Sequence, residues 1–261
     1  MTSEETELIS NVVMDSPNFV PIPLSDANLD IYMNGIHMGQ GNAVGDNKIS
    51  DRNELKLSSR IENERLRDWW PTHIKNGEQT EVKIKGDLVF GVMGYGLKTP
   101  MENNVSFNTS ILSRMSSKEV RMGFIGFDAL VMKNMEFKWD TGGEDGDTAI
   151  VVTMDVKNNL PVEIPLSSIG YQMEMNGVKI AQGASPDHMT IPASGQKEIT
   201  MEMVMDETKI PQWWVTHIQK GEKTAATIDM QLTLEMDGKE QTVELSDMEF
   251  EFNTNIAGSM G

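Results

Sequence analysis

The sequence contains no cysteine, and it is short of aromatic residues and of long apolar runs. Without cysteine, the chain has no disulfide framework, no thiolate zinc site and no cysteine nucleophile. No stretch reaches the roughly 20 consecutive apolar residues that a membrane-spanning helix needs. Residues 1–11 are acidic, whereas a signal peptide begins basic and continues apolar. We therefore expect no direct insertion of the given chain into a membrane.

Basic residues are also scarce, because 22 lysines and arginines face 40 aspartates and glutamates, for a net charge of −18. Such a charge repels phosphate backbones and anionic lipid surfaces, so we expect no nucleic acid partner. A hydrophobic fraction of 38% with 24% charged residues is typical of a folded chain. A length of 261 residues predicts two domains of ordinary size.

Several blocks of the first half recur in the second half in the same order. The matched blocks are Ile22-Pro23-Leu24-Ser25 with Ile164-Pro165-Leu166-Ser167, Met33-Asn34-Gly35 with Met175-Asn176-Gly177, Trp69-Trp70-Pro71-Thr72-His73 with Trp213-Trp214-Val215-Thr216-His217, and Phe107-Asn108-Thr109 with Phe252-Asn253-Thr254. Chance is a poor explanation for a collinear set of this length. The sequence therefore predicts two tandem copies, with one domain at residues 1–115 and a second at residues 116–261.

Strands are predicted from residues that alternate between apolar and polar. Ile199, Met201 and Met203 alternate with Thr200 and Glu202, which places the apolar side chains on one buried face. Segments around residues 172–176 and 248–252 show the same period of two. Such segments are typical of antiparallel strands with one face in water.

Tight hairpins are predicted where an asparagine or aspartate precedes a glycine between two such strands. Asn34-Gly35 and Asn176-Gly177 occupy matched positions, and Asp237-Gly238 follows the same rule. A type I′ turn needs a positive φ at both central residues, which these residue types tolerate.

One short helix is predicted in each copy. The positions with helical spacing are Trp69, Trp70, His73 and Ile74 in the first copy and Ile210, Trp213, Trp214, His217 and Ile218 in the second. Gly221 supplies a left-handed stop. We expect Asp68 to be the N-cap of the first helix, which would place Pro71 in the first turn, and Pro211 to lie in the first turn of the second.

These elements predict a mainly β fold. Many strands, hairpin turns and a single short helix in each copy favour two tandem antiparallel β-sandwiches.

A family resemblance agrees with this fold. Asn158-Asn159-Leu160-Pro161 followed by Ile164-Pro165-Leu166, and Ser16-Pro17-Asn18 followed by Ile22-Pro23-Leu24, resemble the signature that opens the water stress and hypersensitive response (WHy) domain. That domain occurs in late embryogenesis abundant group 2 proteins, which are related to desiccation tolerance, and in archaea and bacteria. The resemblance implies an immunoglobulin- or fibronectin III-like sandwich with one helix, and it brings no catalytic residues with it.

The first copy is predicted to lack its first strand. Met135 to Trp139 forms the apparent first strand of the second copy, and its counterpart would lie before Met1. One interpretation is that the natural protein continues upstream, into a membrane anchor. The other is that the surplus segment at residues 118–130 folds back onto the open edge, since an open edge invites aggregation.

His73 and His217, beside their paired tryptophans, are the best candidates for a ligand site or a pH sensor. The alternative, which we favour, is a helix packed on its sandwich, because identical residues at helical spacing recur in both copies. The repeated structural candidates are Trp69, Trp70, His73, Trp213, Trp214, His217, Asn34, Gly35, Asn176 and Gly177. We expect no catalytic, cofactor-binding or metal-binding residue among them.

The acidic hairpin that contains Asp140, Glu144, Asp145 and Asp147 could attract a cation. Its spacing fails the calcium-loop pattern, so we interpret it as a hydrated turn. No serine elbow, phosphate loop, dinucleotide fingerprint or zinc-protease motif occurs, and we expect the protein not to be an enzyme.

Two functions follow. The first is a non-catalytic protein of the water-stress response that protects or binds an unidentified protein or stressed client. The second is a cell-envelope module, truncated at its N-terminus, that binds a partner through sheet edges or loops. The location stays open: cytoplasmic for the chain as given, or membrane-anchored and extracytoplasmic for a longer one.

Overall fold

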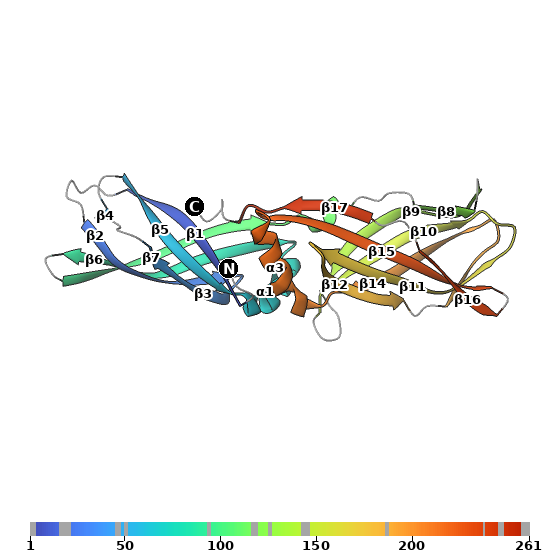
Figure 1. Ribbon diagram of the computed structural model, residues 1–261, viewed down its shortest axis with the longest axis horizontal. Coiled ribbons are helices and arrows are strands. Elements are labelled where there is room, and N and C mark those ends of the chain that lie inside the picture. Colours follow the sequence, from blue (N-terminus) through green and yellow to red (C-terminus); the bar gives the residue numbers. More distant parts are fainter. Residues whose placement is uncertain are drawn as a thin grey trace. The chain divides into compact units, whose positions relative to one another are not determined.

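The computed structural model describes residues 4–15, 22–44, 48–49, 52–92, 95–115, 120–124, 127–141, 147–185, 188–236, 238–244 and 248–256. Strands account for most of these residues, and neighbouring strands along each main sheet order pair antiparallel (Figure 1). The mainly β prediction is therefore confirmed. Three predicted features lie outside the described residues: Ser16-Pro17-Asn18, most of the acidic hairpin at residues 142–146, and Asp237.

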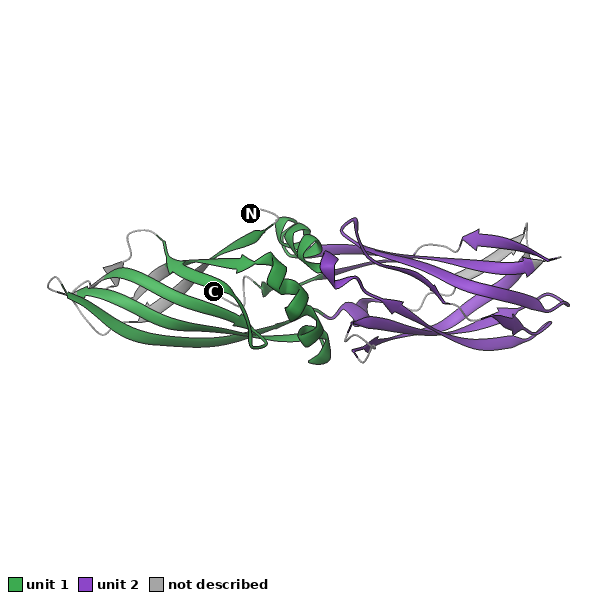
Figure 2. Ribbon diagram, turned by 90° about the horizontal axis from the view of Figure 1, so that it is seen from below, with its two compact units in different colours: residues 1–109, 210–222, 253–261 green, residues 110–209, 223–252 purple. Residues whose placement is uncertain are grey.

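The chain forms two compact units that interleave in the sequence (Figure 2). Unit 1 comprises Met1–Thr109, Ile210–Glu222 and Asn253–Gly261, and unit 2 comprises Ser110–Lys209 and Lys223–Phe252. The predicted domain boundary between residues 115 and 116 stays a prediction. The units interleave because helix α3 (Ile210–Gln219) packs against helix α1 (Leu66–Lys75) within unit 1.

Unit 1 contains one continuously hydrogen-bonded sheet with the strand order β1-β5-β3-β2-β6-β7, to which β4 adds by pairing with β2. Its strands are β1 (Glu5–Asp15), β2 (Ile22–Met33), β3 (Ile36–Ala43), β4 (Lys48–Ile49), β5 (Arg52–Glu62), β6 (Gln79–Val92) and β7 (Tyr95–Asn108). A 3-10 turn, η1 (Asn63–Arg65), leads from β5 into α1. The core includes Ile31, Met33, Leu57 and Ile61, each no more than 2% exposed.

Unit 2 contains two sheets, as a sandwich requires. One has the order β14-β10-β9-β8, and the other has the order β12-β11-β15-β16 with β13 on β11 and β17 on β15. Their bounds are β8 (Val120–Phe124), β9 (Phe127–Asp140), β10 (Ala149–Asn158), β11 (Ile164–Met175), β12 (Val178–Ser185), β13 (Met189–Ile191), β14 (Gln196–Val204), β15 (Lys223–Met236), β16 (Lys239–Glu244) and β17 (Met248–Asn253). Short helical turns lie at α2 (Ile111–Arg114) and η2 (Glu207–Lys209).

The predicted alternation of β14 is confirmed. Ile199, Met201 and Met203 are buried, whereas Thr200 and Glu202 are exposed. The inward side chains of this strand therefore contribute to a methionine-rich core, whose flexible thioether side chains fill irregular gaps.

The two predicted asparagine-glycine hairpins are also confirmed. Asn34 and Gly35 have φ values of 49° and 83°, and Asn176 and Gly177 have values of 53° and 79°. A positive φ at both central residues is what a type I′ turn needs. Each turn joins two paired strands, β2 to β3 and β11 to β12.

Unit 1 has one sheet because β3 pairs with β5, and a glycine lies at that pairing. Gly39 on β3 pairs with Ile61 on β5, and it adopts a φ of 149°. A Cβ atom there would lie 2.0 Å from the carbonyl oxygen of Arg60, so only glycine allows β3 and β5 to pair closely. Ala181 matches Gly39 in sequence, and β12 meets β14 through one isolated bridge between Ala181 and Met205.

The fold-back alternative for the surplus segment is wrong. Val120–Phe124 forms β8, which pairs with β9 inside unit 2 rather than with an edge of unit 1. The segment pairs with β9, its neighbour in sequence. Pairing with the more distant edge of unit 1 would require the loss of these β8–β9 hydrogen bonds. Within the described residues, β1 pairs only with β5, and the absence of a further first strand stays a prediction.

Candidate functional site

Helix α1 begins earlier than predicted. Arg65 is its N-cap and Leu66 its first residue, because the turn η1 runs directly into the helix. The predicted N-cap, Asp68, lies within the first turn, and Pro71 lies inside the helix, so both predictions were wrong. Proline there removes one intrahelical hydrogen bond. Pro211, by contrast, is the second residue of α3 and lies in the first turn as predicted.

The twin tryptophans of α1 and α3 form one cluster, which we call the tryptophan clasp: Trp69, Trp70, Trp213 and Trp214. Their exposed fractions are 1% or less. The ring centroids of Trp69 and Trp214 lie 5.6 Å apart with an interplanar angle of 72°, and those of Trp70 and Trp213 lie 5.4 Å apart at 71°. Both contacts are edge-to-face, the arrangement that aromatic quadrupoles favour. The clasp belongs wholly to unit 1.

The indole N–H groups of the clasp differ in their surroundings. Trp69 Nε1 donates to Thr80 Oγ1 at 2.9 Å. Trp214 Nε1 is buried and has no hydrogen-bond partner among the described residues. A buried N–H without an acceptor destabilises the fold. The packing of the four indole rings must therefore offset the free-energy cost of burying the Trp214 N–H.

His73 lies beneath the clasp at the centre of a hydrogen-bonded chain, which we call the histidine relay: Trp69, Thr80, His73, Thr109 and Glu78. His73 Nδ1 lies 2.7 Å from Thr80 Oγ1, and His73 Nε2 lies 2.9 Å from Thr109 Oγ1. Thr109 Oγ1 donates to Glu78 Oε2 at 2.8 Å, so this hydroxyl accepts from His73. We therefore assign the proton to Nε2, which leaves Nδ1 to accept from Thr80.

The electrostatics of the relay keep His73 neutral. The side chain is fully buried, and burial lowers the pKa of His73 from 6.5 to about 4, against the raising effect of the Glu78 carboxylate. A neutral imidazole with one donor and one acceptor nitrogen matches the two hydroxyls that face it.

A second relay has the same chemistry around α3. His217 Nε2 lies 2.8 Å from Thr254 Oγ1, which donates to Glu222 Oε2 at 2.9 Å. The backbone N–H of Ile256 also donates to Glu222 Oε2. His217 is 0% exposed, like His73. These residues all belong to unit 1.

The backbone after each helix adopts a left-handed conformation that positions Glu78 and Glu222 to hydrogen-bond within their relays. Gly77 and Glu78 have φ values of 70° and 62°, and Gly221 and Glu222 have values of 69° and 61°. The left-handed stop predicted at Gly221 is thus confirmed. A glutamate with positive φ is unfavourable by itself, and its bonds to a threonine side chain stabilise it here.

The hairpin asparagines Asn34 and Asn176 each hydrogen-bond to the backbone of another strand, β6 and β15 respectively. Asn34 Oδ1 accepts from the N–H of Glu81 at 2.9 Å, while Asn34 Nδ2 donates to the carbonyl of Gln79 at 3.2 Å. Asn176 makes the matching pair with the N–H of Ala225 and the carbonyl of Lys223. Each side-chain amide extends the strand ladder beyond the turn, which explains why asparagine recurs.

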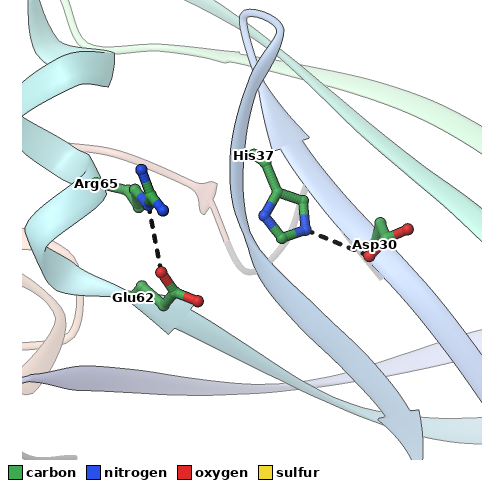
Figure 3. A network of polar contacts seen from close by, with 4 residues as sticks. All are labelled: Asp30, His37, Glu62 and Arg65. Carbon is green, nitrogen blue, oxygen red and sulfur yellow. Dashed lines mark hydrogen bonds and ion pairs between the residues drawn. The ribbon is translucent and has the colours of Figure 1, made fainter.

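Sequence reasoning missed a surface cluster on unit 1 (Figure 3). His37 Nε2 lies 3.2 Å from Asp30 Oδ1, and Arg65 Nε lies 3.3 Å from Glu62 Oε2. The His37 and Asp30 side chains are 41% and 43% exposed, so solvent screens their attraction. The signal was available, because a hairpin at Asn34-Gly35 brings positions 30–32 of β2 opposite positions 37–40 of β3.

Cross-strand pairing explains the charges on this face. Asp30 of β2 lies opposite Lys85 of β6, which lies opposite Glu102 of β7. At the other side, Arg60 of β5 lies opposite Glu7 of β1. Alternating signs on neighbouring strands are favourable, and they are typical of a hydrated sheet face.

Open grooves in the two units are polar. One in unit 1, of about 550 Å³, has a lining that includes Asn34, Gln79, Glu81 and Asn104. In the described part of the chain, no three His, Asp or Glu side chains converge as a metal site requires. Likewise, no helix within the described ranges has the length and apolar character needed to cross a membrane.

Residues 153–247 match the late embryogenesis abundant protein family. The matched segment begins within β10, contains all of β16, and includes Trp213, Trp214 and His217. This match supports a relationship to late embryogenesis abundant proteins through the second half of the chain. Among curated proteins, none matches the chain.

Solved structures of several kinds resemble the chain. A crystal structure of a protein from Archaeoglobus fulgidus is 28% identical, covers 47% of this chain and 96% of its own, and has a TM-score of 0.43. A solution structure of an Arabidopsis thaliana protein is 16% identical, covers 52% of this chain and 82% of its own, and has a TM-score of 0.35. A β-glucuronidase from Bacteroides uniformis is 13% identical over 92% of this chain and 25% of the enzyme, with a TM-score of 0.28.

Proposed function

We propose that this chain is a non-catalytic protein of the water-stress response, built from two copies of a WHy-like domain of the late embryogenesis abundant type. The match of residues 153–247 to the late embryogenesis abundant family carries the proposal. The net charge of −18 repels nucleic acid, so the partner that we infer is a protein. In a response to water stress, this partner is a protein that unfolds when water is lost.

The burial of the relays supports a structural role rather than catalysis. His73 and His217 are the histidines that the matched sequence blocks share, and both are 0% exposed. Both ring nitrogens of His73 face threonine hydroxyls, so neither is available to a substrate. A general base has to reach the proton that it removes, and these side chains do not.

Matched backbone features support the duplication. Ser25 and Ser167 each occupy the extra position of a β-bulge, between β2 and β6 and between β11 and β15. Met38 and Ile180 do so in the hairpins that follow, and both are fully buried. Bulges are specific features of a strand pair, so their recurrence at matched positions favours one blueprint used twice.

The acidic outer surface supplies a physical mechanism for protection. Glu198 and Glu202 on β14, and Glu249 and Glu251 on β17, are exposed, and each follows or precedes a buried residue of its strand. Carboxylates hold water strongly and repel one another between molecules, so the folded protein stays dispersed as it becomes concentrated. A dispersed acidic protein separates partly unfolded clients from one another.

Drying a labile multi-subunit enzyme with the full chain tests this function. We expect the recovered activity after rehydration to exceed that obtained with an equal mass of serum albumin. Equal recovery with albumin would remove the proposal of specific protection. A variant with Glu198→Gln, Glu202→Gln, Glu249→Gln and Glu251→Gln should keep the fold and lose part of the protection, if surface acidity is the active property.

A further inference from the structure

The tryptophan clasp pairs its members reciprocally. Trp69 and Trp213 occupy matched positions in sequence, as do Trp70 and Trp214. In the clasp, however, Trp69 contacts Trp214, and Trp70 contacts Trp213, with nearly equal distances and angles. Each helix therefore contacts the other through the same two tryptophan positions. That reciprocity defines an isologous contact, the kind that identical subunits make about a two-fold axis.

The helix that closes the clasp is a separate piece of unit 1. Residues 110–209 and 223–252, on either side of α3, belong to unit 2. The chain returns through Gly221 and Glu222, both with positive φ. In sequence, α3 is joined on both sides to segments of unit 2 and not to a strand of unit 1. The α3 of a second molecule therefore presents to α1 the same atoms as the α3 of its own chain.

We propose that the clasp is also a self-association site, in which α3 of one chain docks on α1 of a second copy of the same chain. An open clasp exposes large indole surfaces, and association is the usual fate of such a patch. Among possible partners, a second copy has the complementary edge-to-face geometry already built. This inference does not depend on the proposed function.

The charge of the chain sets the conditions for association. Two molecules of net charge −18 repel each other, and salt screens that repulsion. Within one chain, the connection holds α3 close to its own α1, which favours the closed molecule in dilute solution. Docking between chains therefore needs a weakened clasp within each chain, and high ionic strength assists it by screening the repulsion.

Two complementary full-length variants test the proposal. Trp70→Ala damages α1, Trp213→Ala damages α3, and each removes the same Trp70–Trp213 contact. In a mixture, the intact α3 of the first variant and the intact α1 of the second can form one undamaged clasp. We expect the mixture at high ionic strength to contain a heterodimer with twice the mass of one chain by light scattering, while each variant alone stays at the mass of one chain.

The controls make the result decisive. Trp139 lies on β9, outside the clasp, so Trp139→Ala chains that carry different tags should not associate when mixed. If circular dichroism shows that the alanine variants do not fold, Trp70→Leu and Trp213→Leu replace them and keep a large apolar side chain. Two folded variants that remain at the mass of one chain at every concentration would overturn the proposal, and so would equal association of the Trp139→Ala chains.

Discussion

The hydroxyl group of Thr109 lies between His73 and Glu78, accepting a hydrogen bond from the imidazole at 2.9 Å and donating one to the carboxylate at 2.8 Å. One small side chain thus satisfies two buried polar groups. Its loss would leave the His73 N–H without its acceptor and the carboxylate without one of its donors.

Thr109→Val should therefore destabilise the protein although valine has nearly the same shape. We expect the free energy of unfolding to fall by about 1–3 kcal/mol, measured by urea denaturation, because buried polar groups lose their partner. Thr109→Ser keeps the hydroxyl and should recover most of this loss. Thr153→Val, at an exposed threonine pair on β10, should have little effect.

The two members of the Trp69–Trp214 pair predict different costs for the same substitution. Trp69→Phe removes an N–H that donates to Thr80, whereas Trp214→Phe removes a buried N–H that has no partner among the residues that the structure describes. Both substitutions lose some packing. We expect Trp214→Phe to cost at least about 1 kcal/mol less in thermal or urea unfolding than Trp69→Phe. Equal losses would show that the hydrogen bond from Trp69 to Thr80 contributes nothing to stability.

Burial of His73 predicts a dependence of stability on pH. The folded pKa is about 4 and the ordinary value is 6.5. Between these values the unfolded chain binds a proton that the folded chain does not, so stability falls as pH decreases from 6.5 to 4. Below pH 4 both states are protonated and this contribution stays constant. The total effect is roughly 3 kcal/mol.

The contribution of His73 is isolated by comparison with His73→Gln. Carboxylates also respond to acid, but they do so in both proteins. We expect the unfolding free energy of the His73→Gln variant to depend less on pH between 6.5 and 4. Parallel pH profiles for the two proteins would contradict the assignment of a buried, neutral imidazole.

Close pairing of β3 with β5 predicts a strong effect at Gly39. Gly39→Ala places a Cβ atom 2.0 Å from the carbonyl oxygen of Arg60 at an unfavourable φ, and we expect a loss of more than about 1 kcal/mol. Gly41→Ala, two residues further along, meets its nearest neighbour at 3.5 Å and should be tolerated. Hydrogen exchange at β5 should increase in the first variant and not in the second.

Local signals in the sequence were sufficient for the turns and for the existence of the helices. Asn34-Gly35 specified its hairpin because its φ values suit few other residue pairs. The start of α1 was misplaced because η1 continues into it, and the N-cap residue of α1, Arg65, makes no side-chain cap hydrogen bond that would mark the boundary. The prediction therefore placed Pro71 in the first turn of α1, whereas the helix begins at Leu66 and Pro71 lies in its interior.

The partners of the site were harder to predict than its members. Trp69 and Trp214 are distant in sequence, and a spacing rule cannot say which helix faces which. Thr80, Glu78 and Thr109 did carry a signal, because each recurs in the second half as Thr224, Glu222 and Thr254. A polar residue repeated beside an apolar block is a candidate for a buried hydrogen bond, and the relay lies at those positions.

The interleaving of the two units bears on how the protein is made. On the ribosome, the first 109 residues emerge well before α3, and a bacterial or eukaryotic rate of translation separates them by roughly 5–20 s. During that interval Trp69 and Trp70 have no covering helix. A nascent chain at this stage is a natural substrate for a chaperone, and its final tertiary structure waits for the C-terminal residues of the polypeptide.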